Sequence, residues 1–189
     1  GTRAPFRSCL RVMDLATRSS RELVCDTQAL RFTWSDIRWA PDASEVYFQA
    51  QVDGDRNRVQ LVAVDLTASK PAVRLLTDPK QQRTDASALE GWVDGDGLLF
   101  TANDDGFTNL YSYSRKSRQI RQLTRFTDDL SSARLVDAGV FAVHRSPMGS
   151  SLALIDPRTG KTLGEQPQRG KADVIDGHAI RWCAFEHRQ

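Results

Sequence analysis

Short apolar runs separated by polar turns recur along the whole chain, and they have the composition of strands. The clearest runs lie at residues 45–50, 59–64, 98–101, 110–113, 140–143 and 152–155. They are rich in β-branched and aromatic residues, and Gly, Asp and Ser lie between them. No window keeps apolar residues at the i, i+3, i+4 and i+7 positions of an amphipathic helix. The pattern therefore predicts strands joined by tight turns.

These runs form a unit that returns roughly every 40–50 residues. Each copy opens on a phrase that ends in an acidic or glycine-containing turn, and the phrases begin at Trp39, Trp92, Leu135 and Val174. Asp accepts local backbone hydrogen bonds and Gly tolerates a positive φ, so both suit a tight hairpin. Four strands in a unit of this length are typical of a β-propeller blade. The sequence predicts an all-β fold, a β-propeller segment built of four-stranded antiparallel blades.

We expect residues 1–189 to form a single propeller segment with about three full blades and two half blades. The full blades are predicted at residues 36–77, 87–125 and 131–166, and the half blades at residues 9–26 and 172–186. The last strand of each full blade is short and charged, which suits an outer edge that must not pair with other chains. The incomplete first and last repeats indicate a piece of a longer protein.

Charge and hydrophobicity narrow the classes of partner. The chain has 26 basic and 24 acidic residues, a net charge of +2. This balance provides no strong field for a nucleic acid, and we predict no nucleic-acid partner. No apolar run reaches the roughly 18 residues of a transmembrane helix, so no membrane-spanning segment is expected.

The three cysteines, Cys9, Cys25 and Cys183, lack zinc-site spacing. If residues 10–14 and 21–25 form a hairpin, Cys9 and Cys25 lie near each other across it, and a disulfide is one interpretation. The other is a pair of reduced cysteines that act as small hydrophobes. We favour the reduced pair.

No catalytic residue is predicted within this chain. Ser150 or Ser151, Asp156 and His178 follow the order of a hydrolase triad. However, a nucleophilic serine needs an exposed strand–turn–helix elbow, and no G-x-S-x-G motif or following helix occurs here. Blade-surface residues are the better interpretation of this set.

No metal or cofactor site is predicted either. His144, His178 and His187 are scattered, whereas a metal needs three or four ligands that converge. Residues 53–57 have a faint likeness to a calcium loop, but Arg58 stands where such a loop has Gly. A hairpin turn is the simpler interpretation of these residues.

Aromatic and loop residues are weaker candidates for a binding surface or a substrate chamber. Of the four tryptophans, Trp34, Trp39, Trp92 and Trp182, the second and third recur with the blade period. Packing between blades is therefore expected of Trp39 and Trp92, rather than a binding surface. Residues 83–85 lie in a loop that leads into an inner strand, where a substrate chamber is one hypothesis and a solvated loop the default.

The order of the sequence motifs along the repeats resembles that of a known family. The resemblance lies in the phrases at residues 36–42, 46–49, 61–66 and 100–113, followed by Gln122-Leu123-Thr124. Over roughly residues 10–165 this series resembles the propeller of dipeptidyl-peptidase IV-type serine peptidases, which belong to the prolyl oligopeptidase family. Single phrases are shared with TolB-like propellers, so it is the ordered series that supports the resemblance.

The resemblance implies a larger parent enzyme. In the family, an eight-bladed propeller covers a C-terminal α/β-hydrolase domain that removes dipeptides from peptide N-termini. This chain would supply later blades, which gate and position peptide substrates over a hydrolase domain not present in it. The implied partners are a peptide substrate and that hydrolase domain, and the implied location is periplasmic or exported. Separately from the resemblance, a half ring would expose apolar blade faces, so the isolated segment is expected to close into a ring, to form a homodimer or to be marginally stable.

The family's functional residues cannot be carried over to this chain. The paired glutamates that hold the substrate amine lie before the matched blades, and Glu22, Glu45, Glu90, Glu165 and Glu186 are each isolated here. The substrate-binding residues are therefore unknown, and the segment by itself is not expected to hydrolyse peptides. The alternative function is a stand-alone TolB-like propeller that acts as a protein-binding scaffold.

Overall fold

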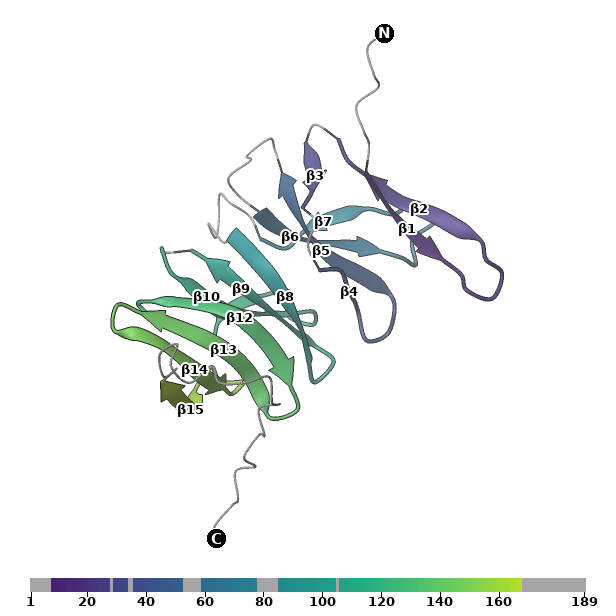
Figure 1. Ribbon diagram of the computed structural model, residues 1–189. Coiled ribbons are helices and arrows are strands. Elements are labelled where there is room, and N and C mark those ends of the chain that lie inside the picture. The colour runs from purple at the N-terminus through teal and green to yellow at the C-terminus, as the bar shows by residue number, and fades with distance from the viewer. Residues whose placement is uncertain are drawn as a thin grey trace, which may run out of the picture.

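The computed structural model describes residues 8–27, 29–33, 36–52, 59–77, 85–104 and 106–167. All regular elements in these ranges are strands, and they form one two-stranded hairpin and three larger antiparallel sheets (Figure 1). This confirms the all-β class and the four-stranded blades. The half blade expected at residues 172–186 lies outside the described residues. In the described part of the chain, no helix has the length and apolarity to cross a membrane.

The strands follow one another in simple order. The N-terminal hairpin consists of β1 (Cys9–Met13) and β2 (Ser20–Cys25). The first sheet consists of β3 (Leu30–Phe32), β4 (Arg38–Trp39), β5 (Glu45–Val52), β6 (Val59–Asp65) and β7 (Val73–Leu75). The second sheet consists of β8 (Asp85–Val93), β9 (Gly97–Asn103), β10 (Thr108–Ser114) and β11 (Ile120–Gln122). The third sheet consists of β12 (Asp129–Val136), β13 (Gly139–Ser146), β14 (Gly149–Ile155) and β15 (Thr162–Pro167).

Each sheet has an irregular strand at the edge that comes first in the chain, and we call this its inner strand. In the first sheet, β3 and β4 both pair with β5 and share the inner position, so the sheet starts before the expected blade boundary at residue 36. The register of β8 shifts between Ala86 and Ala88 and again between Leu89 and Gly91. The register of β12 shifts between Ser131 and Arg134. Such bulges bend a strand and re-aim its side chains.

The central strands of the first and second sheets are apolar on both faces because each of these sheets is packed between two neighbours. On β9, Leu98 and Phe100 belong to the core shared with the first sheet, whereas Leu99 belongs to the core shared with the third. Successive side chains of a strand point to opposite faces, so one strand serves both cores. A third core joins the N-terminal hairpin to the first sheet through Leu23 and Phe48. This two-sided burial explains the continuous apolar runs in the sequence.

An aspartate turn recurs where two neighbouring strands are joined. Asp14 directly follows β1, Asp65 is the last residue of β6 and Asp156 directly follows β14, and each accepts hydrogen bonds from backbone N–H groups two and three residues further on. These bonds lower the pKa of Asp14 and Asp156, and at Asp65 the Thr67 hydroxyl adds the largest contribution in the same direction. The repeated polar tripeptides of the sequence are therefore turn-forming residues.

The N-terminal hairpin contains a correction to the sequence interpretation. Cys9 and Cys25 are directly opposite each other in the ladder and form a disulfide, so the favoured reduced pair was wrong. The ladder between β1 and β2 brings the two Cβ atoms to the same side of adjacent strands. Residue type alone could not decide this, because buried free cysteines are also common.

Candidate functional site at the inner edge of the sheets

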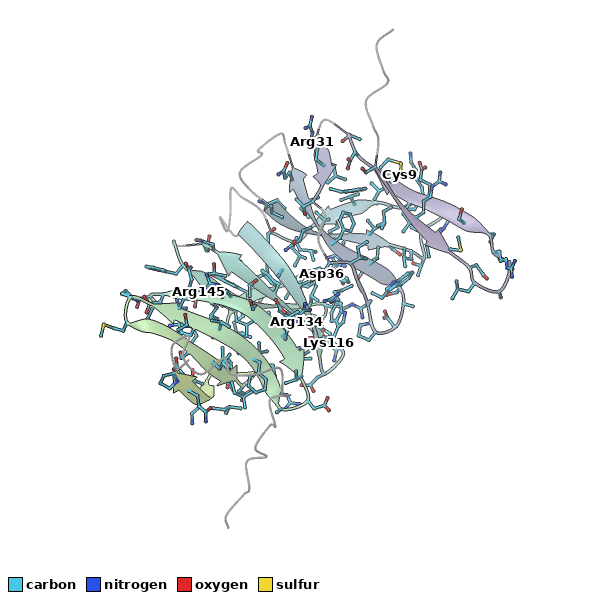
Figure 2. The ribbon with its side chains drawn as sticks, in the orientation of Figure 1. Cys9, Arg31, Asp36, Lys116, Arg134 and Arg145 are labelled. Carbon is cyan, nitrogen blue, oxygen red and sulfur yellow. A yellow bond between two sulfur atoms is a disulfide. The ribbon has the colours of Figure 1, made fainter. Side chains whose placement is uncertain are left out.

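Four charged residues gather where the inner strands of the three sheets meet. Asp36 and Arg38 come from the first sheet, Glu90 from β8 and Arg134 from β12, and we call them the inner-edge cluster. The Arg38 guanidinium lies 3.5 Å from the Asp36 carboxylate and donates a 2.9 Å hydrogen bond to the Leu89 carbonyl. Figure 2 shows Asp36 and Arg134 in the same central region of the molecule. The cluster is therefore assembled from residues almost a hundred positions apart.

Local backbone features bring these residues together. Glu90 is the extra residue of a β8 bulge, since Leu89 pairs with Phe100 and Gly91 pairs with Leu99. A Cβ at Gly91 would lie 3.0 Å from the Leu135 side chain, so the glycine permits β12 to approach β8 closely. The residues that precede these two are Glu90 and Arg134, and the charge of Arg134 acts on the Glu90 carboxyl.

The Glu90 carboxyl has an unusual environment. Burial raises its pKa to about 7, while the charges of Arg134 and Arg38 oppose the increase and the charge of Asp36 adds to it. No hydrogen bond or ion pair to its carboxyl oxygens occurs among the described residues. A half-buried carboxyl without a bonded partner, poised between its two protonation states, is a feature found at binding and catalytic sites.

A second polar network lies between the first and second sheets and has a structural role. Glu45 accepts hydrogen bonds from Arg74 at 2.6 Å and from the Tyr47 hydroxyl at 2.5 Å. Burial would raise the pKa of Glu45, but these bonds outweigh it and lower the pKa, while burial and the same carboxylate raise the pKa of Tyr47. Arg74 also donates to the Tyr113 hydroxyl at 2.7 Å. These groups are bonded to one another across the two sheets, as is typical of a structural network.

Two arginines, each in the turn between the last two strands of its sheet, form ion pairs with the preceding sheet. Arg115 of the second sheet contacts Asp42 of the first at 3.0 Å, and its guanidinium lies 5.8 Å from the Trp92 ring centroid. Arg158 of the third sheet makes two 2.7 Å hydrogen bonds to Asp94 of the second. Hydrogen bonds from Ser44, then the contact with Arg115, lower the pKa of Asp42 to about 2. We call these two contacts the inter-sheet clasps.

A histidine cluster lies in the third sheet. The His144 Nδ1 atom is 2.9 Å from Glu165, and Ser151 donates a short hydrogen bond to the same carboxylate oxygen. These bonds, that of Ser151 first, lower the pKa of Glu165. The other ring nitrogen of His144 lies 3.7 Å from Asp128, on the opposite side of the ring. Because the serine bonds to Glu165 rather than to the histidine, the arrangement is not that of a nucleophilic triad.

An apolar pocket lies between the N-terminal hairpin and the first sheet. Its volume is about 330 Å³, and its lining residues are Ser8, Cys9, Leu10, Phe32, Thr33, Ile37 and Phe48. The rings of Phe32 and Phe48 meet edge to face at a centroid distance of 5.2 Å. Ile37 lies between the two first-sheet members of the inner-edge cluster, so the pocket adjoins that cluster along the chain.

One group of side chains in the described chain has metal-ligand spacing. Single atoms of Cys9, Glu22 and Cys25 lie within 4.8 Å of one another. The two sulfur atoms are bonded to each other, and a metal is bound by thiolates rather than by a disulfide.

The residues singled out in the sequence have mixed positions. Trp92 packs between sheets as expected, with its ring 5.1 Å from the Tyr47 ring and its indole nitrogen donating to the Trp39 carbonyl. The Trp39 side chain is 48% exposed, so its expected burial between blades was wrong. Ser151 lies on β14 and Asp156 in the following turn, where its oxygens are used by turn hydrogen bonds.

Several other candidates cannot be placed. Residues 53–57, Arg83, Trp34, Trp182, His178 and His187 lie outside the described residues. Asp85, the last residue of the expected loop at residues 83–85, is instead the first residue of β8.

Sequence reasoning missed the inner-edge cluster. Glu90 was set aside because no second glutamate stands beside it in the sequence, and Arg134 was not singled out at all. Their proximity depends on two bulged strands that lie side by side. The one available signal was the Glu90-Gly91 pair within an apolar strand, because a glycine inside a strand often marks a bulge or a close approach.

The sequence of the chain matches one family model. The family model described as "Dipeptidyl peptidase IV (DPP IV) N-terminal region" matches residues 8–132. A search of curated proteins finds no match to the chain.

Solved structures resemble the fold. TolB from Acinetobacter baumannii matches with a TM-score of 0.57 and 21% identity over 82% of this chain and 36% of its own. A puromycin hydrolase variant complexed with PGG matches with a TM-score of 0.56 and 21% identity over 76% of this chain and 23% of its own. A Mycobacterium tuberculosis puromycin-hydrolyzing peptidase matches with a TM-score of 0.57 and 14% identity over 79% of this chain and 23% of its own. The chain thus spans only about a quarter to a third of the length of these structures, and identities this low establish the fold alone.

Proposed function

The chain belongs to the family of the dipeptidyl peptidase IV N-terminal region, and we propose that it is the non-catalytic propeller portion of a DPP IV-like serine peptidase. In this role it gates and positions peptide substrates over a hydrolase domain elsewhere in the parent protein. The family match over residues 8–132 is the observation that carries the proposal. The likeness in fold to two puromycin-hydrolyzing proteins is in accord with it.

The inner-edge cluster supports a role in substrate handling. The inner strands of neighbouring blades surround the axis of a propeller, so charged groups on them face any peptide that passes through. A cover over the hydrolase site would exclude bulky chains and control the solvent around the reacting groups. Under this proposal the blades select substrates by access and by charge.

The disulfide supports an exported location for the parent protein. Disulfides persist in oxidising compartments and are rare where cellular thiols keep cysteines reduced. Cys9 and Cys25 are joined in the N-terminal hairpin. A peptidase that acts on peptides outside the cytoplasm would meet such conditions.

A TolB-like protein-binding scaffold is the second candidate function. The turn between β9 and β10 exposes Phe107 at 39%, and the turn between β13 and β14 exposes Met148 at 96%. The two turns join the same strand positions in neighbouring sheets, so both apolar side chains lie at one end of the molecule. Exposed apolar side chains grouped at loop tips are a feature of partner-binding surfaces.

The coding sequence around this chain provides the test. If the reading frame continues beyond Gln189 into an α/β-hydrolase with a serine elbow and later Asp and His, the peptidase proposal is supported. A reading frame that stops soon after Gln189 supports the scaffold instead.

Enzymology of the encoded full-length protein would then test gating directly. The protein should cleave short peptides and reject a folded protein that carries the same N-terminal residues. Equal cleavage of both substrates would contradict a gating role for the propeller.

A further inference from the structure

Two groups of the inner-edge cluster have no bonded partner among the described residues. Arg38 is occupied by Asp36 and by the Leu89 carbonyl. Arg134 is exposed, and the described part of the chain gives its guanidinium neither an ion pair nor a hydrogen bond. Glu90 is half-buried and equally without a bonded partner, although the charge of Arg134 acts on it. The pair therefore presents hydrogen-bonding groups that a ligand can use.

We propose that Glu90 and Arg134 bind a carboxylate, that of the C-terminus of a short peptide. The Arg134 guanidinium forms a charge-assisted pair with the carboxylate, and the Glu90 carboxyl donates a hydrogen bond to one of its oxygens. The Glu90 proton comes from solvent, so binding takes up a proton whenever Glu90 is ionised in the free protein. The peptide origin of the carboxylate rests on the function proposed above, whereas carboxylate binding itself does not.

The charges around Glu90 favour an anion over a cation. From β12 the facing charge is that of Arg134, and from the first sheet the facing charges are those of Arg38 and Asp36. The partner strand β9 presents only Leu99 and Phe100 at this point of the ladder. Asp36 and Arg38 largely compensate each other, which leaves the positive charge of Arg134 in excess beside a protonated Glu90. Because the pKa of Glu90 is about 7, the protonated form is well populated at neutral pH.

Three small peptides distinguish the types of ligand. N-acetyl-alanyl-alanine has a free carboxylate and no free amine. N-acetyl-alanyl-alanine amide has no charged group, and alanyl-alanine amide has a free amine but no carboxylate. Each is titrated against the isotope-labelled 189-residue protein, and binding is followed by NMR chemical shifts. We expect weak, millimolar-range binding of the first peptide only, as befits a single charged contact.

Three substitutions test the residue assignments. Arg134→Gln should weaken carboxylate binding about tenfold or more, the usual loss for a hydrogen bond to a charged group. Arg145→Gln is the matched control, because Arg145 is also an exposed arginine of the third sheet but is not among the charges that act on Glu90. Glu90→Gln keeps an N–H donor at the same place and should preserve binding.

The pH dependence gives the sharpest readout. The affinity of the unaltered protein should fall about tenfold from pH 6 to pH 8 as Glu90 loses its proton, and the Glu90→Gln protein should lose this dependence. An affinity that rises with pH, or binding of the amine peptide instead, would show an ammonium site and overturn the proposal. Equal binding of the acid and amide peptides, or no effect of Arg134→Gln, would overturn it as well. None of these outcomes depends on whether the parent protein has a hydrolase domain.

Discussion

At the residue scale, the environment of Glu90 could not be predicted from its identity. The sequence shows one glutamate in an apolar strand, and an exposed side chain would be the default. The bulge in β8 and the neighbouring inner strands instead half-bury the carboxyl and raise its pKa to about 7. The neighbouring Gly91 indicated that the strand is irregular here. It did not indicate which way the Glu90 side chain points or which residues lie around it.

Glu90→Gln should make folding stability less sensitive to pH. The folded-state pKa of about 7 exceeds the ordinary value of 4.5, so the folded protein holds a proton that the unfolded chain releases between these values. The free energy of unfolding of the unaltered protein therefore falls as pH rises from about 4.5 to 7. The Gln variant should match it at pH 4 and exceed it by roughly 1–3 kcal/mol at pH 8, with allowance for partial exposure. Urea unfolding at both pH values measures this difference.

Glu22→Gln is the control for that measurement. Glu22 is a surface residue whose side chain is 45% exposed and pairs with Arg11. Its substitution should change stability by less than about 1 kcal/mol at either pH. If Glu90→Gln were no more stabilising than this control at pH 8, the raised pKa of Glu90 would be refuted.

Gly160 illustrates a second residue-scale effect, the contact of a turn with the neighbouring sheet. It lies four residues after Asp156 at φ +76°, and Arg18 and Arg118 occupy the same turn position at φ +56° and +57°. The positive φ alone therefore does not demand glycine. A Cβ at Gly160 would lie 2.0 Å from the Leu123 carbonyl oxygen, so it is the close approach of this turn to the second sheet that requires glycine.

Gly160→Ala should lower the free energy of unfolding by roughly 2–4 kcal/mol, because the turn must move away from the second sheet. Arg118→Ala changes the equivalent position, which is already non-glycine, and should stay within about 0.5 kcal/mol. Chemical denaturation of the two variants compares them. Equal small effects would show that the turn adapts without cost.

At the element scale, the strands were largely foreseeable because each obeys a local rule. The central strands are continuous apolar runs, and aspartate turns follow β1, β6 and β14 at Asp14, Asp65 and Asp156. The inner strands were less foreseeable, since β3 and β4 are three and two residues long and share one position. These short segments are strands because they pair with β5, and their own sequences do not predict strands.

The disulfide of the N-terminal hairpin provides a prediction at this scale. Cys9 and Cys25 are separated by 16 residues, and a cross-link of this loop length is expected to contribute about 3 kcal/mol through the unfolded state. Reduction, or the substitution Cys9→Ser with Cys25→Ser, should lower the melting temperature and speed amide exchange in β1 and β2. Thiol titration of the denatured, unreduced protein should find one free thiol among the three cysteines, and a finding of three would contradict the disulfide.

At the scale of the whole molecule, neighbouring sheets are joined by shared cores and by the inter-sheet clasps. The two clasps have the same place in the repeat but differ in exposure. The Arg115 side chain is 20% exposed and also lies 3.5 Å from Glu45, whereas the Arg158 side chain is 68% exposed. A buried charge network is costly to disrupt, and an exposed ion pair contributes little.

Arg115→Ala should therefore destabilise the protein by about 2–3 kcal/mol, because it leaves Asp42 without its cation and Glu45 with Arg74 alone. Arg158→Ala, the matched variant of the other clasp, should cost much less than Arg115→Ala, because solvent screens this exposed ion pair. Thermal unfolding of both variants measures the difference. If the order were reversed, solvent exposure would not be what decides the strength of a clasp.

The purified 189-residue chain should release no product from a chromogenic dipeptide substrate, since in its described residues Ser151 bonds to Glu165 rather than to a histidine. Release that a serine-directed inhibitor abolishes would contradict this expectation and the assignment of catalysis to another domain.

The sequence by itself determined the strand content, the recurring turns and the family, because each depends on residues close together in the chain or on their order. Tertiary structure decided which distant residues meet. Whether Cys9 faces Cys25, and whether Glu90 lies beside Arg134, depends on register, on bulges and on the packing of one sheet against the next. A shift of one residue turns a side chain to the other face of a sheet, so local patterns cannot determine these contacts.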